Sequence, residues 1–138
     1  MSFDDTLASL GKELGLPLEV QDGRAVFEAS FGDDGEDPVT VEISSDDDGR
    51  FAVLSTDIGE LPQNDVEALA TTMLEANHLF AATGGAALSV EGDRAMLERR
   101  VRLEELSRGE GANVIYPFIG LAVQWRRKLI PQLSPLTF

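Results

Sequence analysis

The chain has 138 residues, of which 43% are hydrophobic and 26% charged, and this balance fits one globular domain with its own core. Its 25 acidic residues outnumber its 11 basic ones, and the resulting net charge of -14 disfavours nucleic acids and anionic membranes as partners because a negative surface repels both. The absence of cysteine excludes disulfides, thiolate metal ligands and a cysteine nucleophile.

The negative charge is concentrated in the first half of the chain. Residues 1–65 contain 17 acidic and 3 basic residues, whereas residues 66–138 contain 8 of each. This acidity promotes solubility, which is useful to a protein that exposes apolar surface, although it can also serve solubility alone. The sequence lacks an apolar run of about 18 residues and begins with acidic residues, so we expect no membrane span, no secretory leader and a cytoplasmic location.

The first residues predict an amphipathic helix. Ser2 followed by Asp5 is typical of a capping box, and Gly15 is suited to end the helix. Apolar residues recur between them at helical spacing, at Phe3, Leu7, Leu10 and Leu14. Gly11 lies inside this pattern and costs about 1 kcal/mol relative to alanine, so we expect packing to stabilise the helix.

Three strands are predicted next, over residues 25–31, 39–43 and 51–58. The first two alternate apolar and polar residues, and the third has apolar residues on both faces. The segments between them are rich in aspartate and glycine, which favour turns. This pattern indicates an antiparallel meander.

The second half predicts helix, hairpin and helix. Asn64 with Glu67 indicates a second helix start, and residues 87–90 and 96–98 form a hairpin around residues 91–93. The final helix is expected to begin at Asn113, which leaves Pro117 in its first turn, and to end near Pro131. The predicted class is therefore α+β in the order α-β-β-β-α-β-β-α, with one domain over residues 1–130 and a tail over 131–138.

The histidine and the acidic clusters do not form a catalytic or metal-binding pattern. His78 is the single histidine and lies beside apolar residues, so we interpret it as a packing or surface residue. The acidic runs 33–37 and 46–48 could each bind a hard cation, but the second fails the calcium-loop pattern, because with Gly49 at its sixth position serine occupies both the first and the twelfth. Solvated turns explain them better, although metal-assisted hydrolysis by these carboxylates stays as an alternative.

The glycine-rich and basic segments also have structural interpretations. Residues 83–85 (Thr-Gly-Gly) follow a predicted helix rather than precede one, so they indicate a turn and not a phosphate loop. The arginines of residues 94–102 are too few to indicate nucleic-acid binding and are expected to pair with acids. Trp125 is expected in the core, and residues 126–128 complement the dipole of the last helix. We predict no catalytic, cofactor or metal site.

Several segments in order resemble a known family. Leu61-Pro62 at a helix start, Leu74-Glu75-Ala76-Asn77 in its body and Thr83-Gly84-Gly85 at its exit are similar to the class I chaperones of bacterial type III secretion, the Tir chaperone (CesT) family. Residues 10–17 and 122–126 add to the resemblance, which covers nearly the whole chain. The predicted order of helices and strands is also the order known for that family.

The resemblance implies a function in binding another polypeptide. Members of this family are homodimers that hold the N-terminal chaperone-binding segment of a secreted effector in extended form, pair with it along a sheet edge, and pass it to a secretion ATPase. They need no nucleotide or metal of their own.

The resemblance also directs attention to two sets of apolar residues. The residues expected to contact the effector are Phe3, Leu7, Phe27, Phe31, Val41 and Ile43. The residues expected at the dimer interface are Leu69, Met73, Asn77, Phe80, Leu88 and Val90. For each effector-contacting residue the alternative is a place in the core. A stand-alone regulator or adaptor of the same fold is the alternative function.

Overall fold

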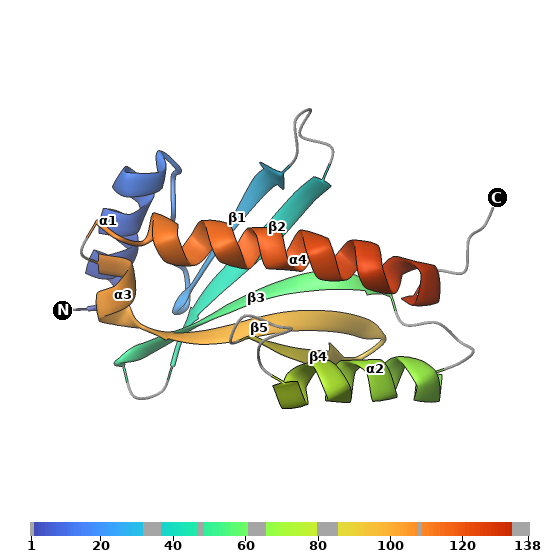
Figure 1. Ribbon diagram of the computed structural model, residues 1–138. Coiled ribbons are helices and arrows are strands. Elements are labelled where there is room, and N and C mark those ends of the chain that lie inside the picture. The colour runs from blue at the N-terminus through green and yellow to red at the C-terminus, as the bar shows by residue number, and fades with distance from the viewer. Residues whose placement is uncertain are drawn as a thin grey trace.

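The computed structural model confirms the α+β class and describes residues 2–31, 37–46, 49–60, 66–79, 86–107 and 109–133 (Figure 1). Its elements in chain order are α1 (Phe3–Leu14), β1 (Arg24–Phe31), β2 (Asp37–Ser45), β3 (Phe51–Glu60), α2 (Val66–Leu79), β4 (Ala87–Glu91), β5 (Arg94–Arg102), α3 (Leu103–Ser107) and α4 (Ala112–Leu133).

Both ends of α1 have the predicted caps. The Ser2 Oγ accepts a hydrogen bond from the Asp5 backbone N–H at 3.1 Å. At the other end Gly15 has a φ of 68°, a left-handed conformation in which its N–H bonds the Gly11 carbonyl. The buried side of this helix includes Phe3, Leu7 and Leu10, so the predicted apolar stripe faces the core.

The five strands form one antiparallel sheet in the order β1-β2-β3-β5-β4. Side chains alternate between its faces, and β3 shows this most clearly because every second residue from Ala52 to Ile58 is buried. Since β1 and β4 end the order, they are the two edges of the sheet.

The described helices pack against one face of the sheet. α4 crosses β1, β2 and β3, while α2 packs beside β4 and α4, and α1 and α3 lie together at one end (Figure 1). The side chains on the opposite face are partly or fully exposed, and they include Arg24, Glu42, Val53 and Arg100. The sheet therefore has a covered face and an open face.

The helix α3 between β5 and α4 was not predicted. Its start is stabilised by Glu105, whose Oε2 accepts a hydrogen bond from the Arg102 backbone N–H at 3.0 Å. This contact is half of a capping box, with the glutamate three residues after the residue it caps. Its apolar residues Leu103 and Leu106 are both buried.

The last helix differs from the prediction at both ends. α4 begins at Ala112 rather than Asn113, so Pro117 lies beyond the first turn that was expected to hold it. It also continues through Pro131 to Leu133, so the predicted boundary between domain and tail at residue 131 falls inside the helix. None of the helices in the described ranges is long and apolar enough to cross a membrane.

Candidate functional site

The structure places most of the early apolar residues in the core, which was the alternative to effector contact. Five of the six residues proposed to contact an effector belong to the hydrophobic core: Phe3, Leu7, Phe27, Val41 and Ile43. Those on β1 and β2 alternate onto the face that α4 covers, which removes them from solvent. The side chain of Phe31 lies outside the described residues.

The residues proposed for a dimer interface are also largely internal. Leu69, Met73 and Leu88 are buried within the single chain, because α2 packs them between itself and β4. Val90 is the exception, with 56% of its surface exposed. Phe80 lies outside the described residues, as do the Leu61-Pro62 and Thr83-Gly84-Gly85 segments and the His78 side chain.

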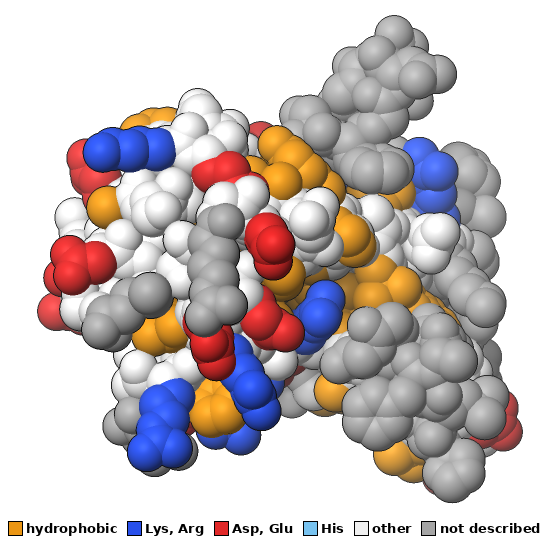
Figure 2. Space-filling view, turned by 60° about the vertical axis from the view of Figure 1, so that its left-hand side comes forward, with side chains coloured by type: hydrophobic (Ala, Val, Ile, Leu, Met, Phe, Trp, Pro, Cys, Tyr) orange, Lys and Arg blue, Asp and Glu red, His pale blue; other side chains and the backbone are white. Residues whose placement is uncertain are grey.

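Four large hydrophobic residues are exposed in the described chain. They are Val26 on β1, Leu74 on α2, Val90 on β4 and Tyr116 on α4. In Figure 2 hydrophobic side chains run through the middle of the face and are bordered by acidic and basic ones. Leu74 is the most exposed, at 69%, and it lies on the helix that packs beside β4.

Asn77 closes part of the β4 edge. Its Nδ2 donates a hydrogen bond to the Leu88 carbonyl at 2.8 Å, and its Oδ1 accepts one from the Leu88 N–H at 2.7 Å. The side-chain amide therefore bonds the β4 backbone as a neighbouring strand would. An added strand cannot use these two groups unless Asn77 moves.

The β1 edge is open by comparison. The Ser45 N–H donates to the Gly23 carbonyl across the β1–β2 ladder. Because the backbone groups of successive residues in a strand point to opposite sides, this bond places those of Val26 and Glu28 on the side away from β2. No described residue bonds these groups. A cavity of about 630 Å³ beside this edge is lined by residues that include Pro17, Arg24 and Val26.

Ion pairs and polar contacts occupy much of the open face. Arg24 pairs with Glu42 at 3.4 Å, and Arg100 pairs with Asp46 at 2.8 Å while its guanidinium lies 3.9 Å from the centre of the Phe51 ring. A third ion pair joins Arg94 and Asp57. The pairs of Arg94 and Arg100 confirm, for these two residues, the prediction that the arginines of residues 94–102 pair with acids. Exposed pairs of this kind contribute little stability.

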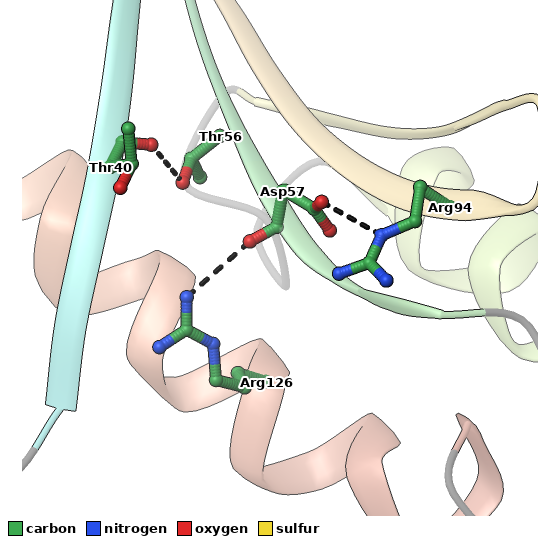
Figure 3. A network of polar contacts seen from close by, with 5 residues as sticks. All are labelled: Thr40, Thr56, Asp57, Arg94 and Arg126. Carbon is green, nitrogen blue, oxygen red and sulfur yellow. Dashed lines mark hydrogen bonds and ion pairs between the residues drawn. The ribbon is translucent and has the colours of Figure 1, made fainter. Parts of the chain in front are cut away.

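The ladder between β2 and β3 stops early. Their pairing ends at Val41 and Thr56, although the register would next bring Thr40 opposite Asp57. The Thr56 hydroxyl donates to the Thr40 carbonyl at 2.7 Å, so a side chain adds a hydrogen bond at the last pair of the ladder. Figure 3 shows β2 and β3 separating beyond this point. We call the opening between them the β2–β3 split.

Arg126 reaches into the split from α4. Its guanidinium donates to the Pro38 carbonyl at 2.7 Å and to the Asp57 carbonyl at 3.4 Å, which joins the two separated strands. Figure 3 shows the second of these bonds. Proline lacks an N–H, so Pro38 could not complete a normal ladder toward β3. The side chain of Arg126 therefore replaces backbone pairing that the sequence itself prevents.

Arg94 and Asp57 form the other wall of the split. The Arg94 Nε donates to Asp57 Oδ2 at 2.8 Å. This hydrogen bond raises the pKa of Arg94 above its usual value against the opposing effect of burial, so the guanidinium stays charged. The second carboxylate oxygen, Asp57 Oδ1, is buried and has no hydrogen-bond partner in the structure.

The described part of the sheet presents surfaces that an extended polypeptide can use. Within the described ranges, no three histidine, aspartate or glutamate side chains gather as metal ligands. An unpaired strand edge, a cavity beside it and an opening in the ladder are instead features that an extended chain can use. Sequence reasoning missed the split, although Pro38 inside a predicted strand connection signalled a break in pairing.

A family model matches most of the chain. The model of the Tir chaperone protein (CesT) family matches residues 5–126. No curated protein matches the sequence.

Solved structures of low sequence identity share the fold. One chain of the heterodimeric ExoU–SpcU complex of the Pseudomonas aeruginosa type III secretion system superposes with a TM-score of 0.66 and 14% identity, covering 94% of this chain and 98% of that one. The Yersinia pestis type III secretion chaperone SycH in complex with a YscM2 fragment gives 0.63 and 17%, covering 89% and 98%. YbjN, a proposed transcription regulator from E. coli, gives 0.59 and 14%, covering 92% and 90%. The fold is shared by a secretion chaperone and by a protein described as a transcription regulator, so the fold alone does not identify a role. The role of this chain therefore rests on the family match.

Proposed function

The chain belongs to the Tir chaperone protein (CesT) family, and from this membership we propose that it is a type III secretion chaperone. It binds the N-terminal chaperone-binding segment of an effector in extended form and keeps that segment soluble until export. A cytoplasmic location, and release of the effector to a secretion ATPase, are parts of this proposal.

The observation that supports strand addition at β1 is the difference between the two edges of the sheet. Asn77 occupies the backbone of Leu88 on β4, whereas Val26 and Glu28 on β1 present backbone groups that no described residue bonds. An effector strand would therefore add to β1, with its main chain bonding these groups and a side chain entering the adjacent 630 Å³ cavity.

The homodimer is the second part of the proposal. The exposed Leu74 on α2 and Val90 on β4 are apolar residues on neighbouring elements, because α2 packs beside β4. In a two-fold interface each of them could be buried against the same surface of a second copy. The interface is thus proposed around Leu74 and Val90 rather than around the buried Leu69, Met73 and Leu88.

The test compares two substitutions at one residue of the β1 edge. Val26→Pro removes an N–H that points away from β2, so it spares the ladder and blocks an added strand. Val26→Thr keeps that N–H and is the matched control. The full chain is co-expressed with the N-terminal 100 or so residues of the effector encoded beside it, and calorimetry measures their affinity.

We expect Val26→Pro to lower the affinity at least about tenfold and Val26→Thr to change it less than about threefold. Equal binding by both variants would overturn strand addition at β1. An effector segment that the wild-type chain neither binds nor keeps soluble would overturn the chaperone function itself.

A further inference from the structure

We propose that the β2–β3 split is a second binding site on the open face of the sheet, and that it takes the backbone of an extended peptide segment. This inference rests on the proposed function, because the bound polypeptide would supply the segment. It concerns a place inside the sheet, distinct from the β1 edge.

The split contains a cavity with hydrogen-bonding groups around it. The cavity has a volume of about 380 Å³ and is lined by Glu28, Pro38, Thr40, Asp57, Ile58, Arg94 and Arg126. It thus brings together residues of β1, β2, β3, β5 and α4. Figure 3 shows Arg94 and Arg126 approaching Asp57 from different elements, β5 and α4.

The backbone around the cavity offers one donor to a ligand. The carbonyls of Pro38, Thr40 and Asp57 already accept hydrogen bonds from Arg126 or Thr56. The Val41–Thr56 pair that ends the ladder is held by the Asp57 N–H, which donates to the Thr40 carbonyl. The Thr40 N–H points into the split beyond this pair and bonds no described residue, so it is suited to a carbonyl oxygen of a ligand.

The side chains add donors and one acceptor. Arg94 uses its Nε for Asp57, and Arg126 uses one N–H of each terminal nitrogen for the strand carbonyls, which leaves further guanidinium N–H groups at the cavity. Asp57 Oδ1 is buried and unpartnered, and such an atom is costly unless a donor reaches it. A ligand that offers both carbonyl oxygens and an N–H satisfies this set.

The charge of the cavity distinguishes a peptide backbone from a charged ligand. Two guanidinium groups, Arg94 and Arg126, face two carboxylates, Glu28 and Asp57, so the lining has no net charge. A carboxylate ligand would meet Glu28 and Asp57, and an ammonium ligand would meet the arginines. The neutral amide groups of an extended chain fit without either repulsion.

The test uses random twelve-residue peptides displayed on phage and selected on the full wild-type chain. Arg94→Gln removes a lining guanidinium, and Arg100→Gln is its matched control, because Arg100 forms an ion pair of the same length through its Nε on the same face, outside this cavity. We expect Arg94→Gln to weaken the selected peptides about tenfold and Arg100→Gln less than twofold, with unchanged thermal unfolding for both.

A position-specific measurement accompanies the affinities. Since the chain has no cysteine, Glu60→Cys and Val26→Cys each provide a single attachment point for a nitroxide, and Glu60 is an exposed residue at the end of β3 that does not line the cavity. A peptide bound in the split should lose its amide NMR signals more strongly with the label at residue 60 than at residue 26.

Three results would overturn the inference: equal affinity of Arg94→Gln and wild type, stronger broadening from residue 26, or selected peptides that bind only through their own carboxylates. If one of these results is found while Val26→Pro still abolishes effector binding, the inference about the split is wrong and the proposed chaperone function is unaffected.

Discussion

Glu13, in the last turn of α1, caps the start of α4, which lies 98 residues further along the chain. Its Oε1 accepts a hydrogen bond from the Gly111 N–H at 3.0 Å, and its Oε2 accepts one from the Ala112 N–H at 2.7 Å. The first N–H groups of a helix have no partner within it, and a carboxylate there also interacts favourably with the helix dipole. One side chain therefore connects the first helix to the helix that covers the sheet.

Replacing this carboxylate should destabilise the fold. We expect Glu13→Ala to lower the free energy of unfolding by about 1–2 kcal/mol, because two N–H groups of α4 lose their acceptor. Urea denaturation followed by circular dichroism measures the change. Glu19→Ala is the control, since Glu19 is exposed and makes no described hydrogen bond. Equal effects of the two substitutions would show that the cap contributes nothing.

Gly11 is required by packing, although a glycine inside a helix is unfavourable in isolation. A Cβ at this position would lie 2.8 Å from the Leu16 carbonyl oxygen, which belongs to the backbone that turns back at the end of α1. Gly11→Ala should therefore lower the free energy of unfolding by about 1–3 kcal/mol despite the better helix propensity of alanine. Ser9→Ala, on the exposed side of the same helix, should change it by less than about 0.5 kcal/mol. Thermal unfolding that is unchanged or raised by Gly11→Ala would contradict this account.

Local patterns in the sequence predicted most of the secondary structure. Ser2 and Gly15 define α1 because caps act within a few residues, and the alternation in β1 to β3 predicted strands because one sheet face is buried. The short helix α3 was missed because five residues carry little periodic signal, although Glu105 was in place to cap it. The end of α4 was placed too early because Pro131 was interpreted as a stop.

The candidate site was much less predictable from the sequence. Apolar alternation is the same for a residue in the core and for one that contacts a partner. The sequence therefore left both places open for Phe27 and Val41, which lie in the core. Asn77 was assigned to the dimer interface through the family resemblance, whereas its bonds to Leu88 depend on how α2 docks on β4. The split likewise depends on Arg126, which is far from β2 and β3 in sequence.

Asn77 should protect the β4 edge in a measurable way. Asn77→Ala leaves the partly buried N–H and carbonyl of Leu88 without partners, so we expect the free energy of unfolding to fall by about 2 kcal/mol. Hydrogen exchange at the Leu88 amide should become faster, and self-association through the opened edge should increase. Asn77→Asp keeps an acceptor for that amide and should protect it partly. Unchanged exchange at Leu88 in the alanine variant would contradict the edge-closing role.

The Thr56 hydroxyl tests whether a side-chain hydrogen bond stabilises the end of the β2–β3 ladder next to the split. Thr56→Val keeps the shape of a buried residue but removes the hydrogen bond to the Thr40 carbonyl. We expect a loss of about 1 kcal/mol in the free energy of unfolding and faster amide exchange along residues 38–41. Ser55→Ala is the control, because Ser55 is a small polar residue on the open face of the same strand. Equal exchange in β2 for both variants would show that this hydrogen bond does not stabilise the end of the ladder.

The proposed dimer is tested at its most exposed apolar residue. Light scattering of the wild-type chain should give a mass of about 30 kDa, which is twice the chain mass of 14.9 kDa. Leu74→Glu places a charge on an apolar position that is 69% exposed in the single chain, so it should weaken association at least about tenfold and leave the fold intact. Tyr116→Glu, at an exposed residue on α4, is the matched control and should stay dimeric. A wild-type chain that is monomeric at micromolar concentration would refute the dimer, and loss of association in Tyr116→Glu alone would move the interface from α2 to α4.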